Sequence, residues 1–158
     1  MTPPSAPPRS TAKRRDHALA QLADQHELWL ATGSQAGPHL IPVCYVWDGR
    51  LITMATFEHS PTVANVRATG TARVAIGHHA DVLMIDGTVA LVPVAGISAE
   101  LGDAFARVSH DPRTTPGFVY LSFTPERVQV WNGFHEYAGR TVMRGGAWWG
   151  SDRRAGGS

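Results

Sequence analysis

The stretch that decides the fold runs from Pro38 to Gly70 and reads PHLIPVCYVW-DG-RLITMATFEHSPTVANVRATG. Two apolar runs, each of a composition typical of strands, flank the pair Asp48-Gly49. An Asp-Gly pair is typical of a two-residue hairpin turn, in which both turn positions take a positive φ. The sequence therefore predicts two antiparallel strands joined at this pair.

A short helix is predicted directly after the second of these strands. Ser60 suits the N-cap, Pro61 suits the first helical position, and Gly70 suits the residue just past the helix end. The first turn of a helix leaves N–H groups unpaired, and these groups bind anions, most often phosphate. Two interpretations stand at this point: a phosphate site, or a surface helix with ordinary caps.

The composition indicates one domain of modest charge. The chain has 158 residues, of which 43% are hydrophobic and 17% charged, and its formal net charge is +1. That length is enough to bury a sizeable core, and no basic stripe is present that would suit a nucleic acid. The single cysteine, Cys44, excludes an intrachain disulfide and favours a reducing compartment. Its apolar neighbours favour a packed thiol over a nucleophile.

Both ends of the chain are polar. Residues 1–15 begin with MTPPSAPPRST, which contains no apolar run, so we expect a flexible tail and no signal peptide. Residues 151–158 are polar and rich in glycine, and we expect a second flexible tail there. Residues 16–150 are predicted to form the single domain. No stretch has the length of a membrane span, and the expected location is the cytoplasm.

The domain reads as many short strands with a few helices. Apolar residues recur at helical spacing over 16–25 and again over 98–108. Besides the strand that follows Asp48-Gly49, strands are predicted over 27–32, 39–47, 71–77, 81–92, 118–123, 127–131 and in a last hairpin within 140–149. Strands mostly follow one another directly, which favours an antiparallel barrel over alternating β-α units.

The strand over 39–47 has two unusual properties. It is apolar on both faces, which is typical of a strand between two layers or in a barrel wall at an oligomer interface. It also contains Pro42, which cannot donate to a ladder, so the strand is expected to be bulged, bent or at an edge there. A barrel with an opening satisfies both observations.

The sequence lacks the common catalytic and metal-binding motifs GxGxxG, GxxxxGK[ST], HExxH, CxxC and GxSxG. His78 and His79 would face opposite sides of a strand, and only a turn would bring them together. We therefore expect an exposed hairpin or pocket rim at these histidines and no metal. Trp131, Trp148 and Trp149 either line a pocket or bury area at an interface, and we favour the interface.

The order of the segments resembles the pyridoxamine 5′-phosphate oxidase-like superfamily. The matching series is a strand (LWLAT), a Gly turn, PHLIPV, a Trp-Asp-Gly hairpin, ITMAT, a Ser-Pro-x-x-x-Asn helix and TARVAIG. VYLSFTPERVQVW and GRTVMRGGAWW are similar to the closing segments of that family. The resemblance implies a mainly β protein with short helices, an antiparallel split β-barrel that forms a homodimer. It also implies that FMN, or the deazaflavin F420, binds between the two subunits.

Carried over residue by residue, the resemblance places nine residues at the cofactor: Ile41, Val43, Met54, Ala55, Thr56, Ser60, Pro61, Thr62 and Asn65. The end of the strand at 54–56 would run along the ring edge, where Thr56 offers its hydroxyl and backbone groups. The strand at 41–43 would lie against another part of the cofactor. The helix start at 60–62 would hold the phosphate, with Asn65 one turn on.

The chain departs from the family pattern near Thr62, where many members carry a basic residue, often lysine. Pro61 and Thr62 offer a helix dipole and a hydroxyl instead, and so lack a charge-assisted contact worth about 1.5–3 kcal/mol. Arg50, Arg67 and Arg73 are the candidates to replace that charge, from the same subunit or its partner.

The function implied by the resemblance is an oxidoreductase that uses FMN or F420 to reduce or oxidise a small planar substrate at a dimer-interface site. The cofactor carries the chemistry in such enzymes, and no catalytic acid or base is named. A non-catalytic, dimeric ligand-binding barrel that has lost tight flavin binding is the alternative. A haem-binding barrel with His59, His78 or His79 as axial ligand is a third. A dimer is expected because Tyr45, Trp47 and the late tryptophans would otherwise lack cover.

Overall fold

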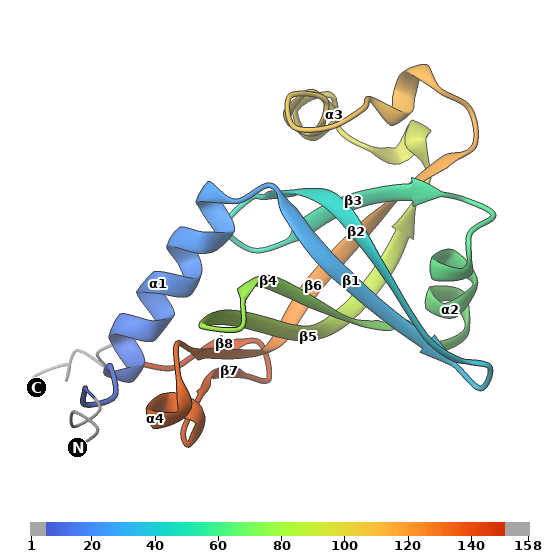
Figure 1. The fold of residues 1–158 in the computed structure, drawn as a ribbon. Coiled ribbons are helices and arrows are strands. Elements are labelled where there is room, and N and C mark those ends of the chain that lie inside the picture. The colour runs from blue at the N-terminus through green and yellow to red at the C-terminus, as the bar shows by residue number, and fades with distance from the viewer. Residues whose placement is uncertain (1–5, 151–158) are drawn as a thin grey trace, which may run out of the picture.

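The structure, a computed structural model, describes residues 6–150 (Figure 1). Eight strands form one sheet in the order β3-β2-β1-β4-β5-β6-β7-β8, and β3 also pairs with β6. This extra pairing closes the first six strands into an antiparallel barrel, which confirms the predicted fold class. The strands are β1 Glu27–Ser34, β2 Gly37–Trp47, β3 Ile52–Phe57, β4 Thr71–His78, β5 Asp81–Val92, β6 Phe118–Trp131, β7 Thr141–Arg144 and β8 Ala147–Trp148.

Four short helices accompany the barrel: α1 Thr11–Asp24, α2 Pro61–Thr69, α3 Ala99–Ala106 and α4 Phe134–Tyr137. Two 3-10 turns, η1 Val94–Gly96 and η2 Pro112–Thr114, flank α3. Figure 1 shows α1 and α2 at opposite ends of the barrel, with α3 on an arm between β5 and β6. None of the helices within residues 6–150 is both long and apolar enough to cross a membrane.

Alternate residues of each strand point into the barrel and form its core. Leu30, Tyr45, Met54, Ile85 and Val128 are each almost completely buried there. The expectation that Tyr45 needs a partner subunit for cover is therefore wrong, because the barrel encloses its ring and the carbonyl of Leu22 accepts its hydroxyl at 3.0 Å. Trp47 also packs against this core.

The N-terminal helix begins at Thr11 rather than at Asp16. Ser10 caps it, because the Ser10 hydroxyl accepts a hydrogen bond from the Lys13 N–H at 3.2 Å. Arg9 is held as well, through an ion pair with Glu136 at 2.8 Å. The prediction of a flexible tail over residues 1–15 is thus wrong from Arg9 onward. Residues 1–5 and the predicted tail at 151–158 lie outside the described residues.

The turn between β2 and β3 differs from the predicted two-residue turn. Gly49 has a φ of +95°, whereas none of the non-glycine residues among 6–150, Asp48 included, has a positive φ. The connection instead spans 48–51. The Asp48 carboxylate accepts the N–H groups of Arg50 at 2.8 Å and Leu51 at 2.6 Å. This side-chain turn, common for Asp, replaced the backbone turn that the Asp-Gly pair predicted.

The helix after β3 matches its prediction. The Ser60 hydroxyl accepts the Val63 N–H at 3.3 Å, Pro61 is the first residue of α2, and Gly70 ends it in the left-handed region at φ +67°. At the other end of the chain, β6 is one continuous strand with an irregular register near Pro125. Helix α4 has no counterpart in the sequence prediction.

Candidate functional site

The barrel wall opens between β2 and β3. These strands pair only through Tyr45–Met54, Val46–Thr53 and Trp47–Ile52. Beyond Tyr45 the rest of β2 pairs with β1 alone, while β3 continues along β6. Pro42 lies in this separated part, so it is at a local edge, as its missing N–H predicted.

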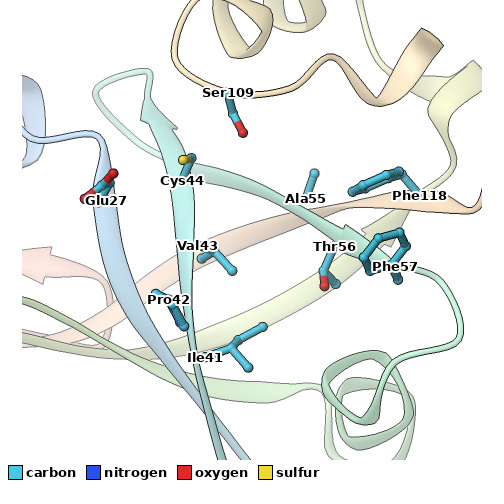
Figure 2. Close-up of a pocket in the computed structure, with 10 residues that line it drawn as sticks. All are labelled: Glu27, Ile41, Pro42, Val43, Cys44, Ala55, Thr56, Phe57, Ser109 and Phe118. Carbon is cyan, nitrogen blue, oxygen red and sulfur yellow. The ribbon is translucent and has the colours of Figure 1, made fainter. Parts of the chain in front are cut away.

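A cavity of about 580 Å³ occupies the opening, and Figure 2 shows the side chains around it. We call this cavity and its lining the β2–β3 mouth. Its volume lies in the range of about 300–1,000 Å³ that is usual for small-molecule sites. The lining residues are Glu27, Ile41, Pro42, Val43, Cys44, Ala55, Thr56, Phe57, Ser109 and Phe118.

The mouth has an apolar floor. Ile41 and Val43 alternate with residues that point outward, and both pack against the barrel core. Thr56 adds one hydroxyl to this floor and is mostly buried. Cys44 and Ala55 belong to the opposite faces of their strands and form the rim. Such a floor suits the flat face of a ring system.

Backbone groups supply the polar part of the mouth. The Tyr45 N–H donates to the His26 carbonyl at 2.9 Å, so the alternation of a strand directs the backbone of Cys44 away from β1 and into the opening. The Asp48 N–H donates to the Leu51 carbonyl at 3.2 Å, and the same alternation turns the backbone of Ala55 toward the opening. The last pairing, Tyr45–Met54, joins the Ala55 N–H to the Cys44 carbonyl, so the sheet leaves the Cys44 N–H and the Ala55 carbonyl without a partner on this side. The backbone of Thr56, which the resemblance placed at the ring edge, instead faces β6.

The start of α2 offers few groups to an anion. Pro61 has no N–H, the Val63 N–H bonds the Ser60 hydroxyl, and the Ala64 N–H bonds the Ser60 carbonyl at 3.1 Å. The N–H of Thr62 is the first-turn donor that remains. Thr62 as a whole residue is 0% exposed, so this N–H is buried together with the side chain, whose hydroxyl has no hydrogen-bond partner among the described residues.

Four of the nine predicted cofactor residues line the mouth, and five do not. Ile41, Val43, Ala55 and Thr56 line it. Met54 is buried in the barrel core. Asn65 is also buried, and its side-chain amide donates to the Thr32 hydroxyl at 3.1 Å. Ser60, Pro61 and Thr62 lie at the helix start, outside the lining. The assignment of all nine residues to a cofactor stays a prediction.

The charge around the mouth is acidic rather than basic. Glu27 is the charged residue in its lining. Of the three arginines expected to replace a family lysine, Arg67 faces Glu58 at 3.6 Å and Arg73 pairs with Asp86. Arg50 belongs to the β2–β3 turn, and none of the three lines the mouth.

An arm over residues 93–117, between β5 and β6, covers one side of the mouth. Phe105 of α3 anchors it by packing edge-on against Tyr120 of β6, with ring centroids 5.5 Å apart. Burial raises the pKa of Tyr120, which keeps this phenol neutral. Ser109 points from the arm toward the cavity, and Phe118 lies against Phe57 with centroids 4.5 Å apart (Figure 2).

Sequence reasoning missed Glu27, Phe57, Ser109 and Phe118 as lining residues and treated Cys44 only as a packed thiol. Phe57 and Phe118 are paired across β3 and β6, a relation that no local pattern reveals. Glu27 lies opposite Cys44 across β1 and β2. That pairing could have been predicted from the sequence, because the register of the hairpin over 27–47 follows from its turn.

The histidines considered as ligands lie outside the mouth. His79 lines a second cavity of about 520 Å³, together with Trp131 and Tyr137. Across residues 6–150, His, Cys, Asp and Glu side chains nowhere gather in a group of three or more that would hold a metal ion.

Comparison with known families gives the classification. The family model for pyridoxamine 5′-phosphate oxidase matches residues 15–132. The chain belongs to this family. The match spans most of α1, the six barrel strands and the arm, and so includes every residue of the mouth. A search of curated protein sequences finds no match.

Solved structures of the same fold carry different functions. An F420 reductase is 18% identical, with a TM-score of 0.56 over 69% of this chain and 93% of the other. An FAD-binding protein from Mesorhizobium loti is 14% identical, with a TM-score of 0.59 over 72% and 89%. A haem-binding protein from Mycobacterium smegmatis is 19% identical, with a TM-score of 0.63 over 89% and 60%. At these identities the likeness concerns the fold alone.

Proposed function

We propose that this protein is an oxidoreductase that binds the ring of a flavin or deazaflavin, FMN or F420, in the β2–β3 mouth. The observation that carries the proposal is an apolar floor beside one backbone donor, the Cys44 N–H, and one backbone acceptor, the Ala55 carbonyl, which the sheet leaves unpaired. A flavin ring has flat apolar faces and a hydrogen-bonding edge, so these two features match its two parts. Membership of the family, and its structural likeness to an F420 reductase and an FAD-binding protein, support the choice of ligand class.

The residues would divide the work as follows. Ile41 and Val43 would pack against the ring, and the backbone of Ala55 would hydrogen-bond its edge. Phe57 and Phe118 would exclude water from one side. When bound, the cofactor supplies the hydride chemistry, while the chain binds and orients it beside a small planar substrate. The ring fits these residues, whereas the phosphate of either cofactor would find no cation in the lining, and the remaining N–H at the start of α2, that of Thr62, is buried.

Filling the mouth tests the proposal. Ala55→Trp places a large side chain on the outer rim without changing the core, and we expect flavin binding to weaken about 100-fold or more because the ring and the indole compete for one volume. Fluorescence titration with riboflavin and FMN measures this effect. Ala90→Trp is the matched control, since Ala90 is exposed on β5 and lies outside the mouth. Unchanged binding to Ala55→Trp would place the flavin elsewhere.

We further propose a homodimer that uses the outer face of β1 and β2. Trp29 is 50% exposed and Leu40 is 58% exposed there, and Trp29 lies opposite Pro42 at the edge of the mouth. Adjacent large apolar side chains on one exposed sheet face are typical of an interface between protein copies. A second copy on this face would also cover the rim of the mouth.

The double variant Trp29→Glu, Leu40→Glu tests the dimer. We expect it to sediment as a monomer where the unmodified chain sediments as a dimer, because burying two carboxylates at the interface is unfavourable. Phe134→Glu is the control, since Phe134 is fully exposed on α4 and lies outside this face. A dimer that survives the double change would contradict the proposed face.

A haem-binding barrel is the second candidate, and the cavity beside His79 is the observation that favours it. Trp131 and Tyr137 give that cavity aromatic walls, and the haem-binding structural neighbour shares the fold. A Soret band on addition of hemin that is lost in His79→Ala would support haem binding. Absence of the band, together with saturable flavin binding, would exclude it.

A further inference from the structure

The phosphate of a flavin cofactor requires partners that this chain does not place near the mouth. A phosphate monoester carries a charge of about −1.5 to −2 near neutral pH and is normally held by several N–H donors or by Arg and Lys. At the start of α2 the proline, the Ser60 cap and the first helical bonds leave the Thr62 N–H as the free first-turn donor, and Thr62 is 0% exposed. A buried N–H does not replace a basic side chain.

The acidic side chains nearby increase this mismatch. Glu27 lies in the lining of the mouth, and Glu58 lies two residues before the Ser60 cap. Arg67, the cation closest in sequence to the helix start, faces Glu58 at 3.6 Å and does not line the cavity. Because Arg67 offsets the charge of Glu58, an anion at the mouth would meet the negative charge of Glu27 and no cation in the lining.

The part of the mouth that binds a ring is complete without the phosphate. Its apolar floor at Ile41 and Val43 and its backbone groups at Cys44 and Ala55 act on the ring alone. We infer that the mouth is selective for an uncharged planar heterocycle, such as riboflavin, over the phosphorylated flavin FMN. This inference rests on the proposed function and specifies its ligand: the ring supplies the affinity, and the phosphate lowers it.

Parallel titrations of the full chain with riboflavin and FMN test the inference. We expect riboflavin to bind more tightly than FMN. Lowering the salt concentration is expected to weaken FMN binding and leave riboflavin binding unchanged, because repulsion between exposed charges grows as screening falls. FMN binding as tight as that of riboflavin or tighter, or FMN binding strengthened at low salt, would overturn the inference and leave the proposed function intact. Failure of both ligands to bind would overturn both.

Three variants locate the effect. Pro61→Lys adds an N–H and a cation at an exposed position of the helix start, and we expect FMN affinity to rise about tenfold with riboflavin affinity unchanged. Ala68→Lys adds the same charge at the exposed far end of α2 and is expected to change neither affinity. Glu27→Gln should improve FMN relative to riboflavin. An equal gain in FMN affinity from both lysines would contradict the assignment to the helix start.

Discussion

Replacing Glu136 by glutamine is expected to lower the free energy of unfolding by about 2–3 kcal/mol at neutral pH. The Glu136 carboxylate is fully buried and accepts four hydrogen bonds. Three come from Arg9, through its backbone N–H, Nε and Nη2, each at 2.8 Å, and one comes from the Asn132 N–H at 3.1 Å. Glutamine removes the charge and two acceptor sites, and so leaves the guanidinium without its counter-ion.

The loss of stability in Glu136→Gln depends on pH, because the ion pair with Arg9 changes the pKa of the Glu136 carboxylate. The hydrogen bonds from Arg9 lower the pKa of Glu136 from 4.5 to about 2. Because the folded-state pKa is depressed, the stabilisation is complete above pH 4.5 and is lost as the pH falls toward 2. Urea unfolding of both proteins at neutral pH and near pH 3 should therefore show the difference in free energy shrinking by more than half.

A matched control separates this effect from general acid destabilisation. Glu126→Gln removes a carboxylate that is exposed on β6, and we expect a change within about 0.5 kcal/mol at either pH. A Glu136→Gln difference that stays constant between the two pH values would contradict the predicted pKa. So would an equal loss of stability in the control.

The Arg9–Glu136 pair shows why the N-terminal boundary could not be predicted. The proline-rich start of the chain predicts a tail, and Arg9 belongs to that tail by local composition alone. Its partner lies on a short helix at the opposite end of the chain, which no periodicity reveals because α4 has a single turn. Long-range ion pairs of this kind have no sequence signature.

The features that the sequence predicted correctly are those that a single residue determines. Ser60, Pro61 and Gly70 each determine a backbone feature by their own covalent structure, and α2 begins and ends where they predict. Pro42 likewise predicted an interruption of the sheet, and the mouth opens beside it. The turn at Asp48 was predicted wrongly because aspartate favours two kinds of turn. Its side chain accepts hydrogen bonds from the N–H groups of Arg50 and Leu51, and these bonds stabilise the longer turn over 48–51.

Only some of the residues of the candidate site could be predicted, because the site depends on tertiary structure. The family resemblance alone named Ile41, Val43, Ala55 and Thr56, and these four line the mouth. The resemblance also assigned Thr62 to a phosphate, but packing of α2 on β1 buries that side chain. Ser109 and Phe118 enter the site only because the arm folds back over β3, an arrangement that follows from the closed barrel.

Gly87→Ala is expected to destabilise the protein by about 3–4 kcal/mol or to prevent folding. At this point β5 opposes an irregular part of β6: Asp86 pairs with Arg127 and Gly87 with Pro125, so one residue of β6 is extra. The two backbones approach so closely that a Cβ on Gly87 would lie 2.7 Å from Cζ of Phe123 and closer still to the carbonyl oxygen of Thr124.

Neither neighbour of that added methyl group can move easily. Phe123 is fully buried in the core, and the Thr124 carbonyl belongs to the strand that pairs with both β3 and β5. Displacing β6 would strain both pairings, and these two pairings close the barrel. Chemical denaturation measures the loss, and Gly33→Ala is the control, because Gly33 of β1 has a negative or extended φ and its added Cβ would meet nothing closer than 4.0 Å. A Gly87→Ala protein as stable as this control would show that the close contact between β5 and β6 is not required for closure.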